Sequence, residues 1–288
     1  MIEGFFADGY WLGQSTVKIP SAGENRFESD ADHYAAYLDT PEGRLRADLT
    51  FENLQEFLPP QDRKSLCALD LGCGNGASGL KLAHLGFYLT LLDSSPAMLQ
   101  LAERSANETG LAAQITLRHA DAALLTDNFQ ARSFDVILCH NLLEFVEDPV
   151  AVLRGAARLM RDSSAVLSVL VRNQAGEVVK AALQAGDLAA AEQNLDAEWG
   201  QESLYLGKVR LFTAEMLEAV LEDASLTPIA RKGVRVISDY LPPQISRTAE
   251  YERILALERR LCSRKEFVGV ARYLHFLARQ RTSGAGAA

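Results

Sequence analysis

Between residues 65 and 172 the sequence alternates short apolar runs with amphipathic stretches, and this alternation restricts the fold more than any other feature. Apolar runs of strand length occur at 65–72, 87–93, 113–121, 134–140 and 165–172. Two of the intervening stretches begin with a helix N-cap followed by proline, Ser95–Pro96 and Asp148–Pro149. Strands that alternate with helices form parallel sheets covered on both faces. We therefore predict an α/β fold with a doubly wound, mostly parallel sheet.

The flanking sequence extends this pattern. A helix is expected over 42–58, an Ala- and Gln-rich helical stretch over 173–200, and a helix capped by Thr213. Strand-like segments at 226–240 and 268–280 would complete a seven-stranded sheet, with a helix over 251–262 between them. We expect an irregular extension (1–26), one domain (27–281) and a disordered tail (282–288). The domain divides into a cofactor half (about 42–171), a helical lid (about 173–223) and a basic substrate-side segment (about 226–281).

Composition narrows the setting. Of the 288 residues 48% are hydrophobic, but no apolar run approaches the ~18 residues that a membrane-spanning helix needs. The opening MIEGFFADGYWLGQ has no basic start, so it does not resemble a secretory signal, and a cytoplasmic protein is expected. The four cysteines form no C-x-x-C pair, which predicts neither disulfides nor a metal site.

The charge is unevenly distributed. The formal net charge is −9, which by itself disfavours a nucleic-acid partner. From Arg231 onward, however, twelve Lys and Arg face five acids and are interleaved with aromatic residues. An anionic ligand with a base could use this mixture, although composition alone slightly favours an ordinary solvated surface.

The segment LDLGCGNG, residues 69–76, lies where the first strand turns into a helix, which is where a nucleotide-like cofactor binds. Its spacing also fits a dinucleotide fingerprint. Asp70 favours S-adenosylmethionine, because a carboxylate there would hold an ammonium group and repel a pyrophosphate. Asp93 ends the second strand and can accept from ribose hydroxyls, and Asp121 could accept from an adenine amino group.

Together with HAD and FDVILCHNLLEFVEDP, these motifs resemble class I S-adenosylmethionine-dependent methyltransferases over residues 65–171. A narrower resemblance, to the tRNA 5-carboxymethoxyuridine methyltransferases, extends from about Asp32 to Arg279. It depends on TPEGRLR (40–46), HNLLEFVEDP (140–149), LSVLVRNQAG (167–176), GVRVISDYL (233–241) and ERRLCSRKEFVGVARYLHFLAR (258–279). It implies a Rossmann-like fold, methylation of the wobble-uridine carboxylate, and the anticodon arm of tRNA as partner.

The resemblance also implies roles for single residues of the cofactor site. Arg46 would pair with the methionine carboxylate, and the turn at Gly72 and Cys73 would lie under the methionine portion, with Gly74 also binding the cofactor. Asp93 would bind the ribose, Asp121 and Ala122 the adenine, and His140 would face the cofactor from the end of the fourth strand. Arg46 could also be an ordinary surface cation, and His140 could cap its strand without binding a ligand.

The chemistry needs little from side chains. A carboxylate acceptor is already ionised at pH 7, so neither a general base nor a protein nucleophile is required. Orientation of that anion does need donors, and Arg235, Tyr240 and Arg272 are our candidates. The chain departs from the family at Arg172, where an aromatic is usual, at Ser238, where a histidine is usual, and in residues 1–26, which relatives lack.

Other functions remain open at this point. The chain could methylate a small carboxylate-bearing metabolite, for which a charge of −9 is no obstacle. It could also bind its nucleotide without catalysis and act through partners. A hydride-transferring dehydrogenase is disfavoured by Asp70 and by the lack of an acid/base pair.

Overall fold

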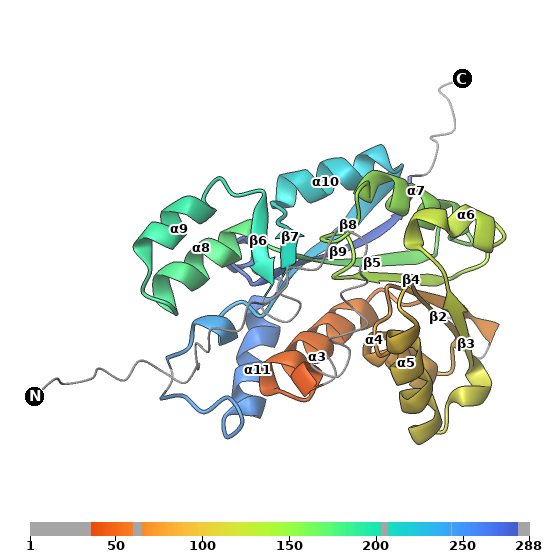
Figure 1. The fold of residues 1–288 in the computed structure, drawn as a ribbon, viewed down its shortest axis with the longest axis horizontal. Helices are drawn as coiled ribbons and strands as arrows, with labels where there is room; N and C mark the ends of the chain where they lie inside the picture. Colours follow the sequence, from red (N-terminus) through yellow and green to blue (C-terminus); the bar gives the residue numbers. More distant parts are fainter. Residues whose placement is uncertain (1–35, 60–64, 203–206, 243, 282–288) are drawn as a thin grey trace, which may run out of the picture.

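The computed structural model describes residues 36–59, 65–202, 207–242 and 244–281, in which a seven-stranded sheet forms the centre (Figure 1). Its strand order is β3-β2-β1-β4-β5-β9-β8. All neighbouring pairs from β3 to β5 are parallel, whereas β9 runs antiparallel to both of its neighbours. The predicted mostly parallel, doubly wound sheet is confirmed. The strands are β1 (Cys67–Leu71), β2 (Tyr88–Asp93), β3 (Ile115–His119), β4 (Val136–His140), β5 (Val166–Arg172), β8 (Leu226–Val234) and β9 (Tyr273–Gln280).

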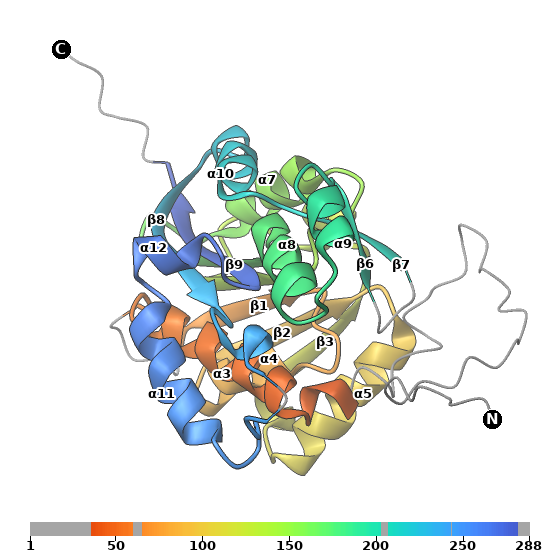
Figure 2. The ribbon, with the colours of Figure 1, turned by 90° about the vertical axis from the view of Figure 1, so that its left-hand side faces the viewer.

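Helices cover both faces of this sheet (Figures 1 and 2). One face packs against α3 (Pro41–Gln55), α4 (Ala77–His84) and α5 (Pro96–Glu108). The other face packs against α6 (Leu125–Asn128), α7 (Pro149–Leu159) and α10 (Ala214–Asp223). Burial on both faces explains why β5 is buried at every position and reads as a continuous apolar run in the sequence.

The helix starts follow the predicted caps. Ser95, Asp148 and Thr213 each accept a hydrogen bond from the backbone N–H three residues later, at the first turns of α5, α7 and α10. The expected helix over 42–58 is α3, and the one over 251–262 is α11 (Tyr251–Leu261). A short helix, α12 (Lys265–Val268), follows α11. The predicted extension 1–26 and tail 282–288 lie outside the described residues.

The predicted helical lid, 173–223, is only partly helical. It contains α8 (Gln174–Leu183) and α9 (Leu188–Asn194), but then an antiparallel hairpin of β6 (Trp199–Glu202) and β7 (Gly207–Arg210) before α10. Each hairpin strand has only four residues, too few to show a two-residue period beside the helical stretch. The hairpin lies between α9 and α10 in Figure 1, next to the carboxyl end of the sheet.

The basic carboxyl-terminal segment is held to the rest of the domain by ion pairs. Three of its cations pair with acids in or just after α3: Lys232 with Glu56, Arg247 with Glu42, and Arg259 with Glu52. Five others also have carboxylate partners: Arg231, Arg235, Arg253, Arg264 and Arg272. Much of the predicted positive charge is therefore neutralised within the chain. No helix in the described ranges is long and apolar enough to cross a membrane.

Glu258 of α11 fixes the loop that follows β8. Its buried carboxylate accepts hydrogen bonds from the backbone N–H groups of Val236 (2.6 Å), Ile237 (3.0 Å) and Ser238 (2.8 Å). These donors have no strand partner, so the carboxylate replaces the sheet ladder where β8 ends. The preceding residue, Arg235, adopts a left-handed backbone conformation with φ 58°.

We expect Glu258→Ala to lower the free energy of unfolding by about 3 kcal/mol, because it leaves buried N–H groups without an acceptor. Urea unfolding followed by circular dichroism measures this change. Glu252→Ala, at an exposed position of the same helix, is the matched control and should stay within about 0.5 kcal/mol of the parent. Equal stability of the two variants would show that the loop does not depend on Glu258.

Candidate active site

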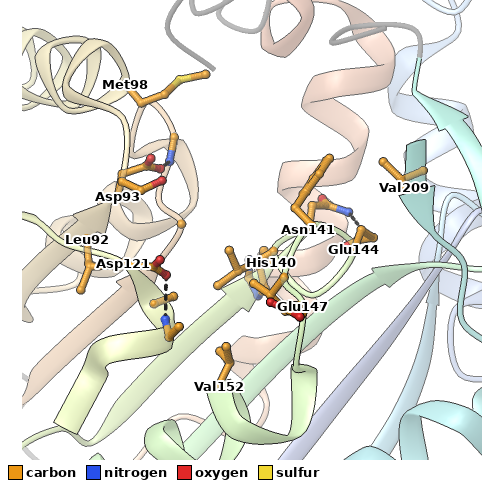
Figure 3. A pocket seen from close by; sticks show the side chains of 18 of the residues that line it. Leu92, Asp93, Met98, Asp121, His140, Asn141, Glu144, Glu147, Val152 and Val209 are labelled. Carbon is orange, nitrogen blue, oxygen red and sulfur yellow. Dashed lines mark hydrogen bonds between the residues drawn. The ribbon is translucent and has the colours of Figure 1, made fainter. Parts of the chain in front are cut away.

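A cavity of about 680 Å³ opens at the carboxyl ends of the strands, where the chain order of the sheet reverses between β1 and β4. Ligands of open α/β sheets bind at such a switch point, and this volume is typical of small-molecule sites. Figure 3 shows Asp93, Met98 and Asp121 on one side, and Asn141, Glu144 and Val209 on the other. We call these the cofactor side and the acceptor side.

The glycine turn 72–76 forms the base of the cofactor side. Gly72 has φ 63°, and a Cβ added there would lie 2.9 Å from Cδ1 of Leu142. The backbone N–H of Cys73 donates to the carbonyl of Leu92 (3.0 Å), which joins the turn to the end of β2. Gly72 and Gly74 both line the cavity, and both have positive φ values (63° and 54°), a backbone conformation that residues with a side chain rarely adopt.

Asp93 ties two loops together. Its carboxylate accepts from the backbone N–H groups of Gly74 (2.9 Å) and Ser95 (2.9 Å). Burial raises the pKa of Asp93, and these hydrogen bonds oppose the increase. The side chain also lines the cavity, so remaining lone pairs can accept from the hydroxyls of a ribose.

Asp121 and Ala122 lie beside Asp93 on the cofactor side. Asp121 caps a short 3₁₀ turn, where its carboxylate accepts from the N–H of Ala123 (2.8 Å), and its side chain is exposed. Ala122 is buried against the same wall. The structure therefore brings the predicted ribose and adenine residues together.

Asp70 lies deeper, at the end of β1. It is buried and lines a smaller cavity that Arg46, Gly72, Cys73 and His140 also line. Its Oδ2 accepts from the N–H of Gly79 in α4 (3.0 Å). Burial raises the pKa of Asp70 to about 7, because the charged form loses its hydration. A ligand ammonium group next to this carboxyl would restore its charged form.

Arg46 and His140 both line the two cavities, so the structure brings these two predicted site residues together. Arg46 projects from α3, and its guanidinium carbon lies 5.1 Å from the ring centre of Tyr37. Burial, together with the charge of Arg46, lowers the pKa of His140 to about 3. His140 is therefore neutral at pH 7 and only a weak base.

His140 is held by two residues that the sequence gave no reason to select. Its Nε2 lies 2.8 Å from Oγ of Ser168, which in turn lies 2.7 Å from Nε2 of His275. The three residues come from neighbouring strands β4, β5 and β9, so only the sheet order brings them together. His275 belongs to the RYLH segment, whose conformity to the family pattern was the only available signal.

The acceptor side also contains residues that sequence reasoning did not assign to the site. Glu144 is buried, and its Oε1 accepts from the side chain of Asn141 (3.0 Å) and from the backbone N–H of Arg172 (2.9 Å). Arg172 ends β5 and, with Arg46, is one of two arginines among the described lining residues of the large cavity. Val209 of β7 completes the wall. Arg172 was noticed only as a departure from the family.

The three acceptor-orienting candidates lie behind this wall and line neither cavity. Arg235 pairs with Asp239, and Arg272 pairs with Glu177 (2.6 Å) and Asp239 (3.4 Å). The hydroxyl of Tyr240 donates to the carbonyl of Val270 (2.8 Å). Both guanidinium groups therefore already have carboxylate partners. The structure does not bring these residues to the lining of either cavity, and their orienting role stays a prediction.

This buried network joins the acceptor wall through Glu177. The Nη1 atom of Arg172 lies 3.4 Å from Oε1 of Glu177, the same oxygen that pairs with Arg272. Burial alone would raise the pKa of Tyr273, but the nearby guanidinium groups, with Arg46 contributing most, lower it to about 8. The guanidinium groups thus outweigh burial at Tyr273, behind the acceptor wall.

Among the described residues no group of side chains is arranged to bind a metal ion. The chemistry of the large cavity instead suits an organic cation with a nucleoside. Asp93 and Asp121 can accept hydrogen bonds from the hydroxyl and amino groups of a nucleoside. The buried Asp70 could bind the ligand's ammonium group, and Arg46 could pair with its carboxylate. The residues therefore fit S-adenosylmethionine.

Comparisons with known proteins agree with this geometry. A family model described as a methyltransferase domain matches residues 62–233. The tRNA 5-carboxymethoxyuridine methyltransferase of Escherichia coli K12 is 27% identical over 268 residues, covering 90% of this chain and 98% of its own length. A ubiquinone biosynthesis O-methyltransferase of Xanthomonas axonopodis pv. citri is 31% identical over 160 residues, covering 52% of this chain and 64% of its own.

Solved structures share the fold. A possible histamine N-methyltransferase from Thermotoga maritima superposes with a TM-score of 0.59 at 14% identity, over 89% of this chain and 98% of that one. The 1,6-didemethyltoxoflavin-N1-methyltransferase of Burkholderia thailandensis, solved with S-adenosylhomocysteine, has a TM-score of 0.52 at 17% identity, over 88% and 84%.

Asp70→Asn tests the expected contact with the cofactor's ammonium group. The variant should weaken S-adenosylmethionine binding on the order of thirtyfold, measured by calorimetry.

The stability of the free protein should change in the opposite direction, so that Asp70→Asn raises the melting temperature at high pH. The folded pKa of Asp70 is raised, so its contribution to stability is lost as pH rises from about 4 through 7. The variant should therefore melt a few degrees higher than the parent at pH 8 and similarly at pH 4. Unchanged cofactor affinity would exclude the contact.

The site and the comparisons now describe the same kind of protein. The family model matches residues 62–233. That range contains the glycine turn and the cavity lining except Arg46. The solved relatives have the same Rossmann-like architecture. This chain belongs to the class I methyltransferases, enzymes that use S-adenosylmethionine as methyl donor.

Proposed function

We propose that this enzyme methylates the carboxylate of 5-carboxymethoxyuridine at the wobble position of tRNA, giving the methyl ester. The observation that carries the carboxylate part of the proposal is the guanidinium group of Arg172 in the wall of the cavity, opposite the cofactor side. Because the tRNA family usually has an aromatic at this position, Arg172 supports an anionic acceptor and does not by itself select tRNA. Similarity to the Escherichia coli enzyme over 98% of its length supports the same acceptor. With tRNA as acceptor, the reaction would take place in the cytoplasm.

The chain's own residues orient the reactants in this reaction. When bound, S-adenosylmethionine supplies an electrophilic methyl group. Asp93 and Asp121 would hold that cofactor on one side of the large cavity, and Asp70 and Arg46 would hold it in the smaller one. Arg172 would hold the acceptor carboxylate by charge-assisted hydrogen bonds, so that one oxygen faces the methyl carbon in line with the departing sulfur. A new carbon–oxygen bond forms, the carbon–sulfur bond breaks, and no proton moves.

The weak basicity of His140 supports a carboxylate in preference to a hydroxyl acceptor. A phenol needs a base to remove its proton, and an effective base has a pKa near the working pH. The pKa of His140 is lowered to about 3, far below that range. Glu144 also lines the cavity, and burial raises its pKa. Its Oε1 accepts from Asn141 and from the backbone N–H of Arg172, so only Oε2, which has no hydrogen-bond partner among the described residues, could take up a proton. An ionised carboxylate needs no such base.

A small carboxylate-bearing metabolite is the second candidate acceptor. Two observations favour it: at least eight cations of the carboxyl-terminal segment are paired within the chain, and the formal net charge is −9. The reaction would be the same, and only the size and charge of the acceptor would differ.

The direct test transfers a labelled methyl group from S-adenosylmethionine to total tRNA from cells that lack this protein. We expect the label in nucleoside digests as a base-labile ester of 5-carboxymethoxyuridine. Unlabelled tRNA, with cofactor binding intact, would reject tRNA as acceptor in favour of the small metabolite.

Arg172→Gln tests the residue that carries the proposal. We expect the KM for the acceptor to rise by about tenfold or more, because a charge-assisted contact is lost. The Kd for S-adenosylmethionine should change less than about twofold. Arg158→Gln, at an exposed position of α7, is the matched control and should change neither constant. An equal loss of cofactor affinity in Arg172→Gln would make the residue structural.

A further inference from the structure

We propose that the outer face of the β6–β7 hairpin is a stacking surface for an unpaired base of the RNA next to the nucleotide in the cavity. This inference rests on the proposed function, since it needs an RNA acceptor. The residues of this surface lie outside the cavity, and none of them is among the site residues predicted from the sequence.

The pairing register of the hairpin separates two chemically different faces. Trp199 lies opposite Arg210, and Gln201 opposite Lys208, so these four side chains share one face. Val209 alternates to the other face, where it is only 1% exposed and lines the cavity. The hairpin is therefore a thin wall with the active site on its inner side.

The outer face combines an aromatic ring with planar and mobile cations. Trp199 remains 47% exposed, and the guanidinium carbon of Arg210 lies 5.3 Å from the centre of its ring. Gln201 and Lys208 are exposed beside them. Within the described ranges neither Lys208 nor Arg210 forms an ion pair, in contrast to most cations of the carboxyl-terminal segment. Aromatic rings and guanidinium planes are what unpaired RNA bases stack on, and cations beside them attract the phosphates.

Two contacts fix this face next to the acceptor. A guanidinium nitrogen of Arg210 lies 3.5 Å from the carbonyl of Glu147, a residue of the cavity lining. On the other strand, the carbonyl of Gln201 lies 3.4 Å from Nη1 of Arg172, the proposed carboxylate-binding residue. A nucleotide whose base enters the cavity would thus place its chain neighbour close to Trp199.

The hairpin also supplies cations that could contact RNA. Ion pairs to α3 and elsewhere use at least eight of the twelve cations that the sequence offered for this purpose. Lys208 and Arg210 lie outside that segment and beside the cavity, where local positive charge can offset the chain's overall −9.

The first experiment compares two acceptors, an anticodon stem-loop RNA with 5-carboxymethoxyuridine at the wobble position and the free nucleoside. Trp199→Ala should raise the KM for the stem-loop by about tenfold or more, which is the range of one base–aromatic stack. The KM for the nucleoside and the Kd for S-adenosylmethionine should not change. Trp199→Phe keeps a ring and should restore most of the stem-loop affinity. Tyr88→Ala is the matched control, since Tyr88 is 55% exposed at the opposite end of the sheet.

A second measurement observes the stack directly. The chain has two tryptophans, Trp11 and Trp199, so Trp11→Phe leaves Trp199 as the sole indole. Its fluorescence should be quenched by the stem-loop and not by the nucleoside. Methyl transfer to RNA with no quenching, and with an unchanged KM in Trp199→Ala, would overturn the stacking surface alone. Quenching without transfer would keep the surface and reject the proposed function. Neither quenching nor transfer would reject both.

Discussion

The carboxylate of Asp93 holds together the two turns on which the cofactor side depends. By accepting from Gly74 and Ser95, it joins the glycine turn after β1 to the start of the helix after β2. Parallel pairing of β1 with β2 brings these turns to the same edge, and the carboxylate then fixes their separation. The cavity, its acidic cofactor side and the approach to Asp70 all follow from this spacing.

The acceptor side is built differently, from pieces that the sheet order collects from the whole chain. Arg172 ends β5, Glu144 lies in the loop after β4, and Val209 comes from the hairpin. Few of these contacts are local in sequence. Residues of the acceptor side can therefore differ between related enzymes while those of the cofactor side are kept, as expected for a fold that serves many methyl acceptors.

Sequence reasoning succeeded where structure is local and failed where it depends on long-range contacts. The caps Ser95, Asp148 and Thr213 and the glycine turn each show their signal within a few residues. The β6–β7 hairpin did not, because its strands are short and its stability comes from neighbouring segments. The pairing of Arg272 with Glu177 was equally hidden. Asp239 is close in sequence to Arg235, but Glu177 lies on α8, far from Arg272 along the chain.

The shared oxygen of Glu177 has a consequence for how this protein can diverge. It is the carboxylate between the guanidinium groups of Arg172 and Arg272, both largely buried. A neutral residue at 177 would remove the carboxylate between two like charges in a poorly hydrated region, although Arg272 would keep Asp239 as a second carboxylate partner. For the fold alone, exchange of Arg172 for an aromatic should therefore cost less than loss of Glu177, although the acceptor contact proposed for Arg172 would be lost. In an alignment of relatives, we would look for Glu177 to persist wherever either arginine does.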